Sequence, residues 1–112
     1  MNTIVAISTA PGNAGIGIIR LSGDESFDII RKIFKTKDEL VNIKPNTIRY
    51  GYIASGDEII DEALVSFFKA PKSFTTENMC EINSHGGTII MQRILELCLE
   101  NGAILAEPRR VY

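Results

Sequence analysis

An acidic residue, Glu81, lies in the middle of a short and otherwise largely apolar stretch of this sequence. The stretch Asn78–Asn83 alternates as a β-strand does, which places Glu81 on the face opposite Cys80 and Ile82. Carboxylates are rarely buried unless something pairs with them. Glu81 is therefore either a solvated residue on an outer face or an acceptor for the paired N–H donors of a planar heterocycle. A charged acceptor makes the stronger hydrogen bonds of that kind.

A basic residue, Arg20, presents the mirror image of this choice. The stretch Gly15–Leu21 also alternates, and it groups Arg20 with Ile16 and Ile18 on one face. A fixed cation beside an apolar row is costly unless an anion or water meets it. Arg20 is thus either a surface cation or a planar fork for a ligand oxygen or carboxylate.

The one histidine, His85, lies in the sequence Asn83–Gly87, which joins a predicted strand to the start of a predicted helix. Unpaired amides at a helix start can hold an anion. General-base chemistry needs a positioned partner, however, and no acid or nucleophile is identified for His85. We therefore interpret His85 as structural, assign no catalytic residue, and interpret Asp61 and Glu62 as solvated residues near a hairpin turn.

A glycine-rich segment, Pro11–Gly17, resembles a phosphate-binding loop in composition only. No Gly-Lys-Ser/Thr follows it, and the residues after Gly17 predict a strand rather than a helix. We interpret the segment as a plain turn and do not expect it to bind a nucleotide.

The hydrophobic pattern predicts strands alternating with two main helices. In the first half, strands are expected at Thr3–Ser8 and Gly15–Leu21. A helix is then expected to begin at the capping box Ser22–Glu25 and to run to about Phe34, and a polar loop to cover residues 35–46.

The second half predicts an antiparallel hairpin, one more strand, a helix and a last short strand. In chain order these are Thr47–Ile53, Ile59–Phe68, Asn78–Asn83, a helix from Gly86 to Asn101-Gly102, and Ala103–Ala106. Antiparallel neighbours combined with helices indicate an α+β fold with a mixed, largely antiparallel sheet.

Composition restricts the classes of function further. The 112 residues fit one domain, and a formal net charge of −2 gives no basic field for binding a phosphate backbone, so direct nucleic-acid binding is not expected. Cys80 and Cys98 form no CxxC pair, so we expect buried thiols and neither a metal site nor a disulfide. No apolar run approaches the roughly 18 residues of a membrane span, and a cytoplasmic protein is expected.

Several of these motifs, in their order and spacing, resemble the N-terminal domain of the TrmE (MnmE) family of tRNA modification GTPases. The strongest stretches are Thr3–Gly12, Gly15–Gly23, Pro71–Thr75 and Glu81–Gly87, with support from Tyr50–Ile53 and Gly102–Pro108. The similarity covers nearly the whole chain. It departs from the family at Thr76 and Asn78, where Gly and Asp are usual, and at Arg109–Tyr112.

The resemblance implies a fold similar to the tetrahydrofolate-binding domain of aminomethyltransferases. It also implies a homodimer that holds 5-formyl- or 5,10-methylene-tetrahydrofolate at the interface between its subunits. The family's folate-binding arginine falls on Arg20 and its folate-binding glutamate falls on Glu81. Residues 1–108 would form this domain, and residues 109–112 would be a truncated end or an added tail. A lysine-bearing stretch of the family pocket, beyond the Glu-Pro turn, is expected to be missing.

The resemblance further implies a role within a larger enzyme. The family hydrolyses GTP with Mg and K ions in a separate domain, works with the flavoprotein MnmG, and carries out carboxymethylaminomethyl-type modification of the wobble uridine of certain tRNAs. None of the GTPase motifs occurs in these 112 residues, so this chain is not expected to hydrolyse GTP. Two alternatives stay open: an aminomethyltransferase-like folate enzyme and a purely structural dimerisation module.

Overall fold

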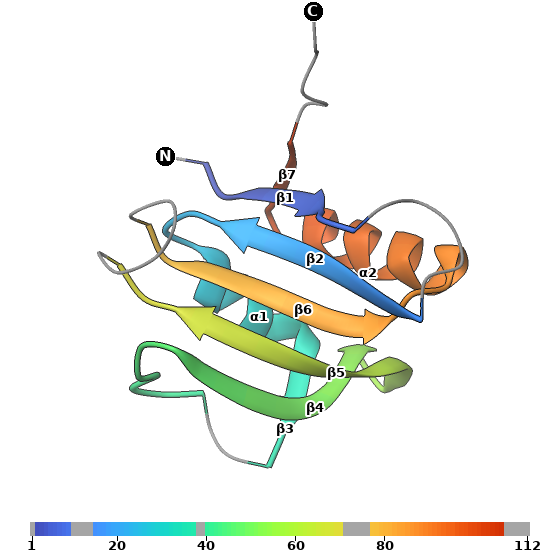
Figure 1. Ribbon diagram of the computed structural model, residues 1–112, viewed down its shortest axis with the longest axis horizontal. Coiled ribbons are helices and arrows are strands. Elements are labelled where there is room, and N and C mark those ends of the chain that lie inside the picture. Colours follow the sequence, from blue (N-terminus) through green and yellow to red (C-terminus); the bar gives the residue numbers. More distant parts are fainter. Residues whose placement is uncertain (1, 10–14, 38–39, 71–76, 107–112) are drawn as a thin grey trace, which may run out of the picture.

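A computed structural model of the chain describes residues 2–9, 15–37, 40–70 and 77–106. These residues form a sheet with the strand order β3-β4-β5-β6-β2-β1-β7, and the helices α1 and α2 lie together behind one face of it (Figure 1). The predicted α+β class with a mixed, mostly antiparallel sheet is confirmed. The similarity to aminomethyltransferases stays a prediction.

The elements follow one another in this order: β1 (Ile4–Ile7), β2 (Ile16–Ser22), α1 (Ser26–Ile33), β3 (Phe34–Thr36), β4 (Thr47–Ser55), β5 (Glu58–Phe68), β6 (Met79–His85), α2 (Thr88–Glu100) and β7 (Ile104–Leu105). Strand β7 pairs with β1 in parallel, and the other neighbours are antiparallel. The middle of the sheet is formed by β5 and β6, which follow one another in the sequence, and by β2, which comes from near the N-terminus.

The core lies between the sheet and the two helices. Alternate residues of each central strand point to the helices, as period-two patterning requires. Phe27 of α1 meets Phe67 of β5 edge to face, with ring centroids 5.3 Å apart and an interplanar angle of 85°. The fully buried side chains include those of Val5, Ile19, Leu21, Ile30, Val65, Ile82 and Ile94.

The predicted hairpin and the predicted C-terminal helix are both confirmed. β4 and β5 pair from Thr47 to Ser55 around a tight turn, with a register shift between Ile53 and Ala54. Helix α2 ends at the predicted place, because Asn101 is its C-cap and Gly102 adopts a φ of +111° that favours glycine. Cys80 and Cys98 are buried free thiols, also as predicted.

The predicted start of the first helix is wrong. Ser22 does not cap a helix but ends β2, and α1 begins only at Ser26 without a side-chain cap hydrogen bond. The hydroxyl of Thr3 instead accepts a hydrogen bond from the Glu25 amide at 2.9 Å. Thr3, which lies 22 residues before Glu25, thus supplies a hydrogen bond at the start of α1, where the capping box Ser22–Glu25 is predicted to act.

The predicted polar loop at residues 35–46 is also partly wrong. Phe34 to Thr36 form β3 at the edge of the sheet. The apolar Phe34 is therefore a core residue of a strand and not the last residue of the helix. Leu40 and Ile43 are buried, although they lie in a segment with mostly polar residues. Residues 11–14 of the turn predicted at Pro11–Gly17 lie outside the described residues, and Ile16 and Gly17 already belong to β2.

The sheet face opposite the helices carries exposed apolar side chains, and we call it the open face. Ile16, Ile48, Tyr50 and Leu64 are each roughly half exposed or more. Ile48, Tyr50 and Leu64 lie on the paired strands β4 and β5, and β6, which carries Glu81, Asn83 and His85 on this face, separates them from Ile16 on β2. Among the described residues, no helix is long and apolar enough to cross a membrane.

Candidate functional site

Arg20 and Glu81, the two residues singled out in the sequence, meet on the open face. They are direct register partners on β2 and β6, and partners in an antiparallel ladder point to the same side of the sheet. The guanidinium donates from Nε and Nη2 to Glu81 Oε2, at 2.9 and 2.5 Å. From the sequence, an anion or water is expected to meet Arg20 beside its apolar row, and Glu81 is that anion.

Solvent can reach both side chains of the pair, and the pair does not use all of its hydrogen-bonding atoms. The side chain of Arg20 is 41% exposed and that of Glu81 is 19% exposed. Both hydrogen bonds from Arg20 go to Oε2, and none of the described residues donates to Oε1. A half-buried carboxylate oxygen beside a fixed cation can accept N–H donors from a planar ligand, while the guanidinium can donate to a neighbouring oxygen.

A hollow of about 280 Å³ lies on the open face further along β6, and we call it the central hollow. Its lining includes Ile16, Tyr50, Leu64, Asn83 and His85. Asn83 is two residues from Glu81 on the same face of β6, so roughly 7 Å of strand separates the carboxylate from the edge of this hollow. Arg20 and Glu81 are therefore next to the hollow rather than within its lining.

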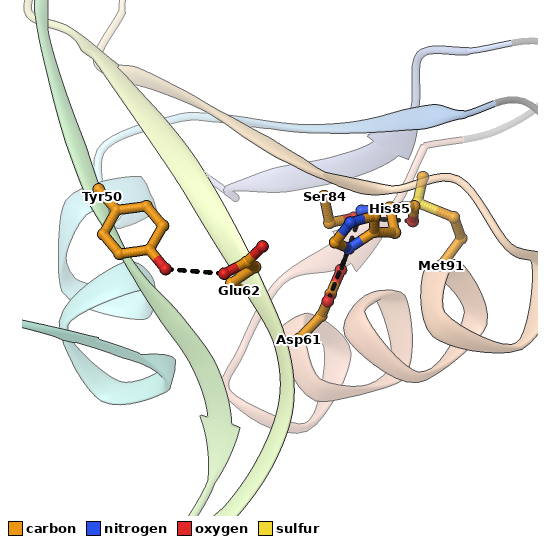
Figure 2. Close-up of polar contacts among 6 residues, drawn as sticks. All are labelled: Tyr50, Asp61, Glu62, Ser84, His85 and Met91. Atoms are coloured by element: carbon orange, nitrogen blue, oxygen red, sulfur yellow. Dashed lines mark hydrogen bonds and ion pairs between the residues drawn. The ribbon is translucent and has the colours of Figure 1, made fainter.

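His85 has the partner acid that sequence reasoning did not identify. Asp61 on β5 receives the His85 backbone N–H at 2.9 Å, and its two carboxylate oxygens lie 2.9 and 3.0 Å from His85 Nδ1 (Figure 2). The interpretation of Asp61 as solvated is wrong, because its side chain is only 10% exposed. One carboxylate thus fixes both the backbone and the ring of His85.

This pairing determines which ring nitrogen of His85 carries a proton. A carboxylate only accepts, so Nδ1 carries the proton and Nε2 is left toward the surroundings. The hydrogen bond from Asp61 and its negative charge raise the pKa of His85 above the ordinary value of 6.5. The side chain is 62% exposed, so the ring can exchange protons with solvent.

Tyr50 and Glu62 form a second polar pair beside the hollow. The Tyr50 hydroxyl donates to Glu62 Oε2 at 2.7 Å, and Figure 2 shows the ring reaching from β4 toward β5. Hydrogen bonds with Tyr52 and Glu62, together with the negative charge of Glu62, raise the pKa of Tyr50. The phenol therefore stays protonated near neutral pH and acts as a donor.

The cysteines take no part in this site. Burial raises the pKa of the Cys98 thiol to about 12 and raises that of Cys80 as well, so neither thiol is a nucleophile at neutral pH. In the described part of the chain, no group of three His, Cys, Asp or Glu side chains is placed to hold a metal ion.

The missed residue, Asp61, had a signal in the sequence. In the β5–β6 ladder Leu64 pairs with Asn83, which brings residues near 62 opposite His85. Extending the hairpin register to β6 would have placed an acid near the histidine. That register requires knowing that β5 pairs with β6, and the alternation of each strand alone does not reveal its partners.

Fold and site together define a class of protein. It is a small α+β domain whose sheet has both helices on one face (Figure 1) and, on the other face, the Arg20–Glu81 pair beside the central hollow. The sequence profile described as "GTP-binding protein TrmE N-terminus" matches residues 3–109. Because that match covers nearly all of the chain, the chain belongs to this family.

Curated relatives agree with the family match. Proteins named "tRNA modification GTPase MnmE" are 50% identical in Thermoanaerobacter pseudethanolicus, 49% identical in Listeria innocua and 52% identical in Levilactobacillus brevis. Each alignment covers 96% of this chain but only 23–24% of the relative. The chain thus spans about a quarter of the length of these relatives.

Proposed function

We propose that this domain binds a one-carbon tetrahydrofolate on its open face and pairs there with a second copy of itself. The ligand would be 5-formyl- or 5,10-methylene-tetrahydrofolate. The observation that carries the proposal is the Arg20–Glu81 pair, because a pterin offers a planar amino-pyrimidinone edge whose N–H groups suit a carboxylate.

The surroundings of the pair support a ligand of this kind. The central hollow begins beside Glu81 and combines apolar walls, at Ile16 and Leu64, with the polar groups of Asn83 and His85. Ligand sites commonly combine apolar contact with a few placed polar groups. The residues present therefore fit a folate, with Glu81 and Arg20 orienting its heterocycle.

The apolar residues of the open face support dimerisation. Exposed apolar side chains gathered on one face of a small domain usually mark an interaction site, and here Ile48 and Leu64 are neighbours on that face. A second copy placed against this face would cover the apolar side chains and exclude water from the Arg20–Glu81 pair. Exclusion of water strengthens charged hydrogen bonds.

The larger role that we propose follows from the family. The domain would serve a cytoplasmic tRNA modification enzyme that works with an MnmG-type flavoprotein on the wobble uridine of tRNA. GTP and the Mg and K ions would be bound by a separate GTPase domain. Binding of tRNA and MnmG would then depend on the whole protein.

Thermal melting with added 5-formyltetrahydrofolate tests the proposal. A ligand that binds only the folded state stabilises it by about 2.7 kcal/mol at one hundred times its Kd, so the wild type should melt at a clearly higher temperature. Glu81→Gln should lose most of this rise. Glu100→Gln, which changes an exposed glutamate on α2, should keep it.

Two results would contradict the proposal in different ways. A dimer whose melting temperature does not respond to folate would indicate a purely structural module. Turnover of a folate-linked carbon by this chain alone would indicate an aminomethyltransferase-like enzyme instead.

A further inference from the structure

The Arg20–Glu81 pair would hold only one end of a folate. Beyond its heterocycle, a folate continues into an aminobenzoyl ring and then into a glutamate, to which further γ-linked glutamates can be attached. If the proposed function holds, the protein surface beyond Glu81 must meet an aromatic ring first and several carboxylates next.

The strand register leads from Glu81 across the sheet to a second hollow. Glu81 pairs with Ser66 on β5, and Ser66 pairs with Ile48 on β4. At about 4.8 Å per strand, Ile48 lies roughly 10 Å from Glu81 on the same face. Ile48 lines a hollow of about 680 Å³ along β3 and β4, which we call the edge hollow.

The edge hollow is basic, although the whole chain has a net charge of −2. Lys35, Lys37 and Arg49 are in its lining, and none of the acidic residues that the structure describes is. No carboxylate among the described residues forms an ion pair with Lys35 or Lys37. Cations in this arrangement attract an anionic group with several carboxylates.

An aromatic side chain connects the two hollows. Tyr50 lines both the central and the edge hollow. Its hydroxyl is held by Glu62 at 2.7 Å, and its ring meets that of Tyr52 with centroids 5.9 Å apart. A ring fixed in this way, next to the exposed Ile48, is suited to contact an aminobenzoyl group.

The opposite direction along the sheet does not suit an acidic tail. The central hollow contains His85, but its lining also includes Glu62, and Asp61 is bonded to the His85 ring. These carboxylates would repel a polyglutamate. The charges therefore favour the edge hollow over the central hollow.

We propose that the edge hollow, through Lys35 and Lys37, binds the glutamate tail of the folate, so that the domain prefers folates with several γ-linked glutamates. This inference rests on the proposed function and names the form of ligand that the site selects.

Calorimetric titration with two ligands tests the inference: 5-formyltetrahydrofolate with one glutamate and the same compound with three. The wild type should bind the triglutamate at least fivefold more tightly. Lys35→Gln and Lys37→Gln should each weaken triglutamate binding by roughly two- to fivefold, the range of an exposed ion pair. Added salt should reduce the preference.

Lys32→Gln is the matched control, because it removes an exposed lysine from α1 on the helical side of the sheet. It should bind both ligands as the wild type does. Equal affinity of the wild type for the two ligands, or equal losses in Lys32→Gln and Lys35→Gln, would overturn the inference and leave the folate site standing. Failure of the wild type to bind either ligand would overturn both.

Discussion

Arg20 and Glu81, 61 residues apart in the sequence, face each other directly across β2 and β6, with Arg20 Nε 2.9 Å from Glu81 Oε2. The pair lies on the sheet face that the helices leave uncovered. A fixed cation and a fixed carboxylate are thus held side by side where a ligand can reach them. The consequences of this placement can be measured.

The pair should contribute little to folding. Partly exposed ion pairs typically stabilise a protein by about 0.2–1 kcal/mol. Glu81→Gln and Arg20→Gln should therefore each lower the free energy of unfolding in urea by no more than about 1 kcal/mol. A loss above roughly 3 kcal/mol, as expected for a broken buried pair, would mean that the residues are structural.

The proton affinity of His85 should depend on Asp61. Because the chain has a single histidine, its imidazole resonance can be followed by NMR without ambiguity. We expect a pKa above 6.5 in the wild type. Asp61→Asn should bring the pKa back toward 6.5, and Glu62→Gln should lower it less, because Glu62 contributes only a small part of the shift. A wild-type pKa at or below 6.5 would contradict the pairing.

The same pairing predicts how stability changes with pH. The folded-state pKa of His85 lies above its unfolded value, so the folded state binds the proton more tightly. This contribution is fully present below about pH 6.5 and is lost as the pH rises through the folded-state pKa. Relative to His85→Gln, the wild type should therefore lose stability over that range in thermal melts. A parallel pH dependence in the two proteins would count against the prediction.

Gly51 should be intolerant of a side chain. A Cβ at this position would lie 2.2 Å from the backbone oxygen of Lys35 and 2.9 Å from the ring of Phe34, so β3 would have to move. Gly51→Ala should destabilise the protein by about 1–3 kcal/mol. Gly15→Ala, where a Cβ meets nothing within 4 Å, should change stability by less than about 1 kcal/mol. Equal effects of the two substitutions in urea unfolding would contradict the packing of β3.

Self-association should depend on the open face. Leu64→Lys places a charge in the middle of the exposed apolar surface, and it should weaken the dimer by at least tenfold, which corresponds to about 1.4 kcal/mol. Ile89→Lys makes the same change at an exposed position on α2 and should leave association unchanged. Sedimentation equilibrium measures both. Dimerisation that survives Leu64→Lys but not Ile89→Lys would place the interface on the helices.

Local patterns in the sequence predicted much of the fold. Alternation located β2 and β6 closely and placed Arg20 and Glu81 on the correct faces. The run to Asn101-Gly102 correctly ended α2. These features depend on residues that are close together in the sequence, so local sequence patterns are enough to predict them.

Features that depend on distant partners were missed. The S-x-x-E pattern at Ser22 predicted a helix start, but Ser22 is held in β2 by its ladder with β6, and Thr3 supplies the hydrogen bond instead. Strand β3 has only three residues and forms because β4 offers an edge. Asp61 contacts His85 only because β5 pairs with β6. In each case tertiary contacts override or complete a local preference.

The central claim is that Glu81 binds the heterocycle of a tetrahydrofolate, and calorimetric titration of 5-formyltetrahydrofolate into wild type and Glu81→Gln tests it most directly. Both proteins should be compared at the same, measured oligomeric state. Loss of a charged hydrogen-bond acceptor typically costs about 1.5–3 kcal/mol, so Glu81→Gln should bind roughly ten- to one-hundredfold more weakly. Equal affinity of the two proteins, or no binding by the wild type, would contradict the account.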